Sequence, residues 1–122
     1  MFDVTAESIQ YIREGRLRAL AVTAADRSEA LPNIPAMADF LPGFEASFWT
    51  GLGAPKNTPS EIITKLNMEI NVAISDPVMK SRFADLGSSV FPPGSPAEFG
   101  QFIGEETQKW GNVVKAAGMK AE

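Results

Sequence analysis

The chain has 122 residues, of which 44% are hydrophobic and 21% are charged, and its formal net charge is −4. This composition is typical of a globular protein and excludes a disordered chain or a fibrous repeat. Cysteine and histidine are both absent, which excludes disulfides, thiol or Ser-His-Asp catalysis, and metal sites built on those side chains. Eleven basic residues face fifteen acidic ones, so no nucleic-acid partner is expected.

The first 23 residues predict a helix followed by a strand. Ile9 and Ile12 form an apolar pair at helical spacing, and Gly15 suits the position that ends a helix over about residues 7–14. The apolar run within residues 17–23 predicts a strand buried on both faces of a parallel sheet, although so short a run also fits a helix. Such a strand needs neighbours, so we expect the chain to lack its natural N-terminus and to be a fragment.

The middle of the chain is rich in residues that favour turns. Residues 24–35 contain prolines, Asp, Asn and Ser and are expected to form a loop. A short helical turn is expected at 36–40. Residues 44–53 alternate partly between bulky apolar and small or polar side chains, which predicts a strand.

Three start signals predict three helices in the second half. Capping boxes at residues 58–61 and 95–98 each place a proline at the first helical position, and an Asp-Pro pair stands at 76–77. The expected helices begin at about residue 59, run from 77 to about 86, and run from 96 to 118. A short strand is expected at 88–91.

Few residues point to chemistry. The Gly-x-Gly at 51–53 lacks the rest of a nucleotide-binding fingerprint. Glu105 and Glu106 are adjacent on a helix, where they point in different directions and cannot form a catalytic dyad, so we expect solvated surface. Trp49 and Trp110 could stack on a ligand, but packing in a core or interface is the expected role.

The ordered set of segments resembles a known family. MFD, EGRLRALAVT, LPGFEASFWTGLGAPKNTP, SDPVMKSRFADLG and KWGNVVKAAGMK follow one another as in the receptors of tripartite tricarboxylate transporters, the Bug-type solute receptors. The resemblance covers essentially the whole chain. Members of that family are more than twice this long, and the matching region is their C-terminal part.

The resemblance implies an α/β fold: the C-terminal part of a two-domain type II periplasmic-binding-protein fold, with a helix-rich second half. Residues 1–43 would end the distal ligand-binding domain, 44–54 would be the hinge crossover strand, and 55–122 would be the C-terminal half of the proximal domain. Because a returning crossover strand packs against both flanking layers, Phe48 and Trp49 are expected to be buried. Phe2 and Asp3 align with a loop that lines the cleft, so they are the expected ligand-binding residues. For Asp3, capping of a helix N-terminus is an equal alternative.

The implied function is capture of a small carboxylate or related anion in the periplasm and its delivery to the membrane permease subunits of the transporter. No catalysis, cofactor or metal is implied. An intracellular ligand-sensing module that borrows the same fold is the alternative, and an enzyme using carboxylates, or a metal held by carboxylates, is a third. Because strand 17–23 would expose an apolar edge, the chain is also expected to self-associate or to be the remnant of a longer polypeptide.

Overall fold

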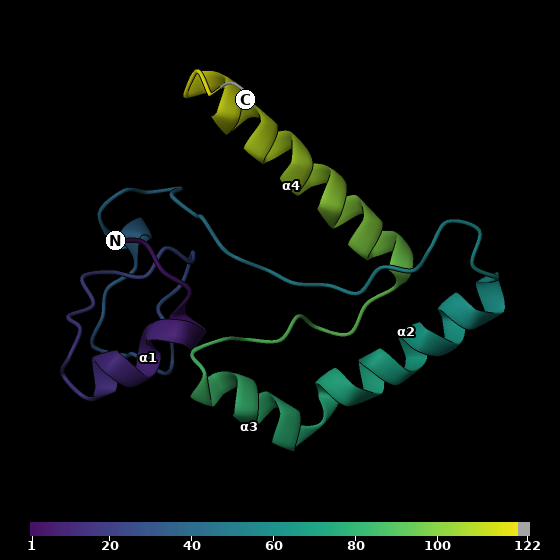
Figure 1. Cartoon of the computed structure of the whole chain (residues 1–122), viewed down its shortest axis with the longest axis horizontal. Coiled ribbons are helices and arrows are strands. Elements are labelled where there is room, and N and C mark those ends of the chain that lie inside the picture. Colours follow the sequence, from purple (N-terminus) through teal and green to yellow (C-terminus); the bar gives the residue numbers. More distant parts are fainter. Residues whose placement is uncertain (120–122) are drawn as a thin grey trace.

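The computed structural model describes residues 1–119. Its helical elements in chain order are α1 (Thr5–Arg13), the 3-10 turn η1 (Met37–Asp39), α2 (Ser60–Ser75), α3 (Pro77–Asp85) and α4 (Pro96–Ala116). Helices α2 and α3 pack end to end, while α4 lies apart from them, and two extended segments, 44–56 and 88–94, run through the space between (Figure 1).

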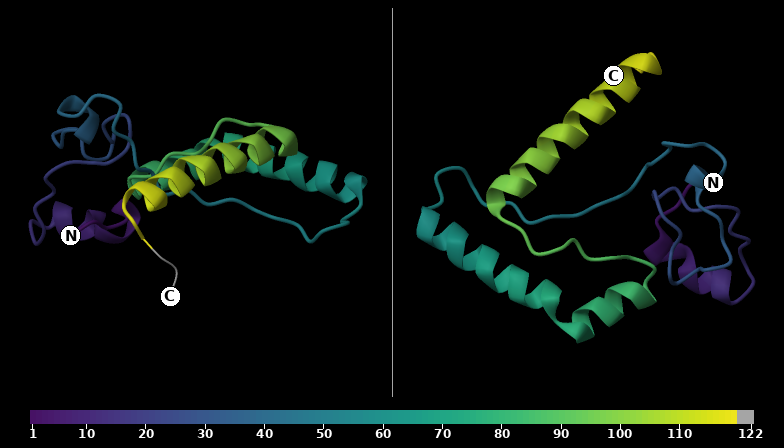
Figure 2. Two further views of the ribbon diagram at one scale, coloured as in Figure 1. Left: turned by 90° about the horizontal axis from the view of Figure 1, so that it is seen from above. Right: turned by 180° about the vertical axis from the view of Figure 1, so that it is seen from behind.

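The molecule is less compact than a globular monomer of its size. Its accessible surface is 9743 Å², whereas a compact monomer of its mass would expose about 6,400 Å². Figure 2 shows the reason: the helices of the second half are spread out, with α4 apart from α2 and α3, and they do not enclose a core. Among the described residues, the buried apolar side chains are those of Ile9, Leu31 and Ala36, all in the N-terminal third.

This small N-terminal core meets the second half of the chain at Gly87. Gly87 ends α3 in the left-handed conformation, with φ +69°, as glycine at such a position commonly does. A Cβ there would come within 2.5 Å of Thr5 Cγ2 and 3.1 Å of Ile9 Cδ1. The absence of a side chain therefore lets helix α1 pack directly against the main chain that leaves α3.

None of the three predicted strands forms a β-ladder within the described chain, so these three predictions are wrong. Residues 17–23 contribute only a single parallel bridge, in which the Val22 N–H donates to Pro35 C=O at 2.9 Å and the Met37 N–H donates to Val22 C=O at 2.8 Å. Residues 44–53 and 88–91 are extended but form no ladder within the described chain. A strand is defined by a hydrogen-bonded neighbour, and an apolar run does not show whether that neighbour is present.

The helix predictions hold, with one error at a cap. Asp76 caps α3 by accepting the Val78 N–H at 2.8 Å and the Met79 N–H at 3.1 Å, as expected. The box predicted at 58–61 does not form: α2 begins one residue later, its N-cap is Pro59, and the Thr58 hydroxyl donates to Pro55 C=O instead. The turn expected at 36–40 is present as η1.

The capping box of α4 is complete. Ser95 Oγ accepts the Glu98 N–H at 3.2 Å, and Glu98 Oε2 accepts the Ser95 N–H at 2.7 Å. Hydrogen bonds from the main chain and then the hydroxyl of Ser95 lower the pKa of Glu98 below its ordinary value. The carboxylate is thus held in the charged form that favours a helix N-terminus.

We expect Ser95→Ala to lower the free energy of unfolding by about 1 kcal/mol, the usual cost of losing an N-cap hydroxyl. Denaturant unfolding followed by helical circular dichroism measures it. Ser60→Ala is the matched control, because Ser60 also stands at a helix start but α2 has no side-chain cap. Equal losses in the two variants would contradict the assigned role of Ser95.

Two asparagines of α2 hold the main chain just before α4. The amide of Asn71 donates to Gly94 C=O at 2.9 Å and accepts the Gly94 N–H at 3.2 Å, and Asn67 donates to the same carbonyl at 2.9 Å. Asn71 thus binds both polar groups of Gly94, as a neighbouring strand would. This anchor is the direct polar link between α2 and the residue that precedes the cap of α4.

Candidate functional site

The residues expected to bind ligand, Phe2 and Asp3, lie at the exposed N-terminal end. The Phe2 side chain is 88% exposed. Asp3 Oδ1 accepts the N–H of Val4 at 3.0 Å, and Val4, not Asp3, is the N-cap residue of α1. The alternative in which Asp3 caps the helix is therefore wrong, and its carboxylate stays accessible to solvent.

A second and denser cluster lies where the extended segment 44–54 runs antiparallel to α4 (Figure 1). Glu45 pairs with Lys109, Trp49 contacts Phe102 and Glu106, and Gly51 lies against Phe99. Residue numbers thus rise along the segment as they fall along the helix.

Gly51, the first glycine of the Gly-x-Gly pattern, has a packing role that needs no nucleotide. A Cβ at Gly51 would overlap the ring of Phe99, so a side chain there would displace that ring. A Cβ at Gly53 would meet no atom within 4 Å.

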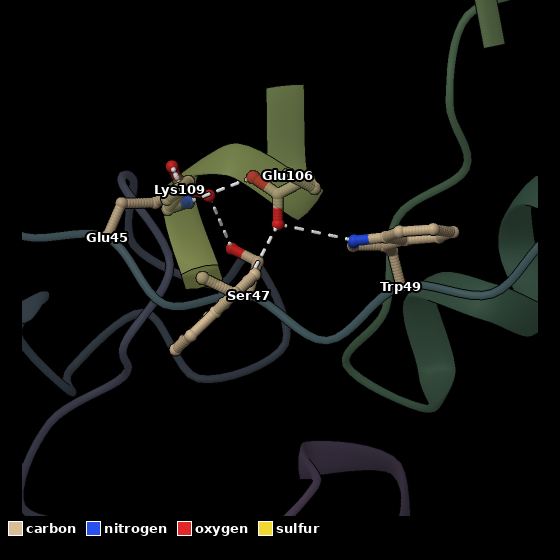
Figure 3. Close-up of polar contacts among 6 residues, drawn as sticks. Glu45, Ser47, Trp49, Glu106 and Lys109 are labelled. Atoms are coloured by element: carbon tan, nitrogen blue, oxygen red, sulfur yellow. Dashed lines mark hydrogen bonds and ion pairs between the residues drawn. The ribbon is translucent and has the colours of Figure 1, made fainter. Parts of the chain in front are cut away.

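The centre of the cluster is the carboxylate of Glu106, whose side chain is only 14% exposed (Figure 3). Its Oε1 accepts from Lys109 Nζ at 3.1 Å. Its Oε2 accepts two indole N–H groups, from Trp110 at 3.0 Å and from Trp49 at 3.4 Å. Lys109 Nζ also donates to Glu45 Oε2 at 3.1 Å, and Ser47 Oγ donates to the other carboxylate oxygen of Glu45 at 2.9 Å.

The electrostatics follow from these contacts. The hydrogen bond from Lys109 is the main cause that lowers the pKa of Glu106, and the two indoles lower it further against the opposing effect of desolvation. Glu106 and Glu45 in turn raise the pKa of Lys109 above its ordinary value. At neutral pH the three side chains therefore form a chain of alternating charge, minus, plus and minus.

Aromatic rings cover one side of this charged chain. The ring of Trp49 meets Phe102 edge-on with centroids 5.0 Å apart and Phe99 at 5.9 Å, and Phe102 meets Phe91 at 5.3 Å. Trp49 is thus half-buried in packing contacts, in agreement with the expected packing role. Phe48, expected to be buried beside it, points away from α4 and is 74% exposed, because neighbouring residues of an extended segment face opposite sides.

For Glu106 the expectation of a solvated surface residue is wrong, and for Glu105 it is right. Glu105 is exposed and accepts only from Gln101 Nε2 at 2.8 Å, so the two carboxylates do not share a proton. The missed signal was spacing: Glu106, Lys109 and Trp110 stand three and four residues apart, on the helix face that Phe99 and Phe102 also occupy.

The cluster provides binding and positioning groups, not a catalytic constellation. Within residues 1–119, no group of three or more His, Cys, Asp or Glu side chains is placed to hold a metal ion. No helix in that range combines the length and apolar character required to cross a bilayer.

Comparison of the chain with known proteins gives consistent matches. Residues 1–119 match the family described as "Tripartite tricarboxylate transporter family receptor". The chain is 39% identical over 113 residues to the protein BugT of Bordetella pertussis and 37% identical over 116 residues to a UPF0065 protein of Pseudomonas sp.. These matches cover 92% and 93% of this chain, which spans about a third, 34%, of the length of each relative.

Two solved structures have the same fold over the chain. The R. palustris protein Rpa4515, solved with adipate, has a TM-score of 0.85 at 31% identity and is matched over 93% of this chain and 38% of its own. The periplasmic binding protein BugD also has a TM-score of 0.85, at 30% identity, with 94% of this chain and 39% of its own covered.

Proposed function

The chain belongs to the tripartite tricarboxylate transporter receptor family, and from this premise we propose that it is part of a periplasmic solute-binding receptor. The receptor captures a small carboxylate or related anion and delivers it to the membrane permease subunits of a tripartite tricarboxylate-type transporter. The observation that carries the proposal is the family match over residues 1–119.

The family assignment confirms the resemblance drawn from the sequence. The likeness to BugD and Rpa4515 confirms the fold class, the C-terminal part of a periplasmic-binding-protein fold. The family is one of receptors, as expected for a chain without the residues of common catalytic machinery. A carboxylate ligand is supported by the adipate in the Rpa4515 structure, because adipate carries a carboxylate at each end.

For the domain organisation we propose the division that the resemblance implies: 1–43 in the distal domain, 44–54 as the crossover, and 55–122 in the proximal domain. Two features support this proposal: the small buried core lies before residue 44, and the long helices follow residue 59. The extended segment 44–54 is the connection between the two (Figure 2). In the receptor this segment is the crossover that returns from the distal to the proximal domain.

Phe2 and Asp3 are the proposed ligand contacts within this chain. Both side chains are exposed, so a ligand could reach them. Phe2 offers an apolar face for the methylene chain of a dicarboxylate. The Asp3 carboxylate, which bears the same charge as the ligand, would act as an acceptor for ligand hydroxyls or bound water and would disfavour anions without such groups.

Calorimetric titration of the receptor polypeptide that carries this chain tests the proposal. We expect adipate or a related di- or tricarboxylate to bind at one site and to be recovered unchanged after prolonged incubation. Phe2→Ala should weaken binding about tenfold, or 1.4 kcal/mol, whereas Glu105→Gln on the exposed face of α4 should leave it unaltered. Conversion of the ligand, or no binding of any carboxylate, would contradict the proposal.

A further inference from the structure

Both tryptophans of the chain donate to a single atom. The indole N–H groups of Trp49 and Trp110 each point to Oε2 of Glu106. Trp110 belongs to the same helix as Glu106, but Trp49 lies 57 residues away in sequence, on the extended segment. The carboxylate thus joins a helix to a segment that has no sheet to hold it (Figure 3).

The charged groups around this carboxylate are few. Lys109 faces it from the same helix, and Glu45 approaches from the extended segment through Lys109. Glu105, the neighbouring acid, is occupied with Gln101 on another side of the helix. A change in the charge of Glu106 would therefore be felt mainly by Lys109 and the two indoles.

The extended segment has little main-chain support. Among the described backbone hydrogen bonds, two tie it to the N-terminal unit (residues 1–43): the Phe44 N–H donates to Leu41 C=O at 3.0 Å, and the Ala46 N–H donates to Thr23 C=O at 2.9 Å. Its attachment to α4 consists of the Glu45–Lys109 pair, the Trp49–Glu106 hydrogen bond, and the packing of the Phe99 and Phe102 rings on Trp49 and of Phe99 on Gly51. The polar contacts, which are the first two, depend on the charged network around Glu106.

We propose that Glu106 is a latch: its ionised carboxylate fastens the extended segment, and with it the N-terminal unit, to helix α4, and neutralising the carboxylate releases the segment. An ionised carboxylate accepts from all three donors at once, whereas a protonated one accepts poorly and loses the attraction of Lys109. Where this segment is the crossover of a two-domain receptor, which rests on the proposed function, the latch fixes the crossover to the proximal domain.

The direction of the pH dependence follows from the contacts. Hydrogen bonding by Lys109 and the indoles lowers the pKa of Glu106. The stabilising effect is therefore complete above the ordinary pKa of glutamate and is lost as the pH falls through the lower folded-state value. The latch is closed at neutral pH and opens only in acid.

Two-dimensional ¹H–¹⁵N NMR of the 122-residue chain tests the latch without any ligand, because the two indole N–H groups give two resolved signals. Between about pH 7 and pH 3 both signals should titrate with one shared midpoint, below the glutamate value of about 4.3. In Glu106→Gln both signals should be displaced already at pH 7 and should no longer follow that midpoint. In the matched control Glu105→Gln the shared midpoint should be unaltered.

Different midpoints for the two indoles, or loss of the titration in Glu105→Gln, would overturn the proposal. If circular dichroism shows that Glu106→Gln does not fold, Lys109→Met decides the question. Removing the main cause of the lowered pKa should raise the shared midpoint toward the ordinary glutamate value, and an unaltered midpoint would refute the latch. Because no carboxylate ligand is used, failure here is distinct from failure of the proposed receptor function.

Discussion

Replacing Trp49 by alanine is expected to lower the free energy of unfolding by about 3 kcal/mol, in the range found for removal of large aromatic side chains from packed sites. The indole packs on Phe99 and Phe102 and donates to Glu106, so the substitution removes two aromatic contacts and one hydrogen bond together. Denaturant unfolding followed by circular dichroism measures the change, with wild type and variant at the same protein concentration because association alters apparent stability.

Phe48→Ala is the matched control, because Phe48 is adjacent to Trp49 but 74% exposed. Its free energy of unfolding should stay within about 0.5 kcal/mol of the wild type, as is usual for surface substitutions. If the two variants lost equal stability, or if Trp49→Ala lost less than about 0.5 kcal/mol, the attachment of the extended segment to α4 through this ring would be refuted.

The purified 122-residue chain is expected to self-associate at micromolar concentration, as the sequence also predicts. Its surface exceeds that of a compact monomer by about 3,300 Å². Covering a third of that excess on each of two copies would bury about 2,200 Å², within the range of obligate dimers. The exposed apolar side chains on the two long helices include Ile62, Leu66, Ile103, Val113 and Val114. In a purified solution a second copy is the partner available to cover them.

Light scattering coupled to size exclusion measures this association. The expected mass is at least twice 13.1 kDa. Paired replacement of Ile62 and Leu66 by lysine should reduce the associated fraction, because it places two charges on the exposed apolar side of α2. As a control, lysines in place of Ser81 on α3 and Gln108 on α4, both of which are exposed, leave the apolar side chains intact and should not reduce association. A compact 13.1 kDa monomer that unfolds cooperatively would contradict the prediction.

Local signals in the sequence predicted local structure well. The starts of α3 and α4 follow from Asp76-Pro77 and from the Ser95–Glu98 box, because a cap is made by residues that are neighbours in the chain. Thr58 shows the limit of this reasoning. Its hydroxyl donates to Pro55 C=O and caps no N–H of α2, which begins after Pro59 instead.

The strands and the candidate latch could not be predicted in the same way, because both depend on partners distant in sequence. The apolar run ending at Val22 carries no information on the neighbour that would complete a ladder, and within residues 1–119 only Ala36 forms a bridge with it. Glu106 was expected to be solvated because its own helix gives no sign of Trp49. The ligand residues Phe2 and Asp3 came from family resemblance, and their role stays a prediction.

The Asn71 anchor has a consequence for how the chain tolerates changes of loop length. Because one amide binds both polar groups of Gly94, the position of Gly94 is set by helix α2 and not by the path of residues 88–93. An insertion or deletion in that loop would be absorbed upstream of Gly94, and α4 would still begin at the same place and in the same direction. We therefore expect changes of loop length between Gly87 and Phe91, the residue that packs on Phe102, to leave the face of α4 that carries Glu106 in position.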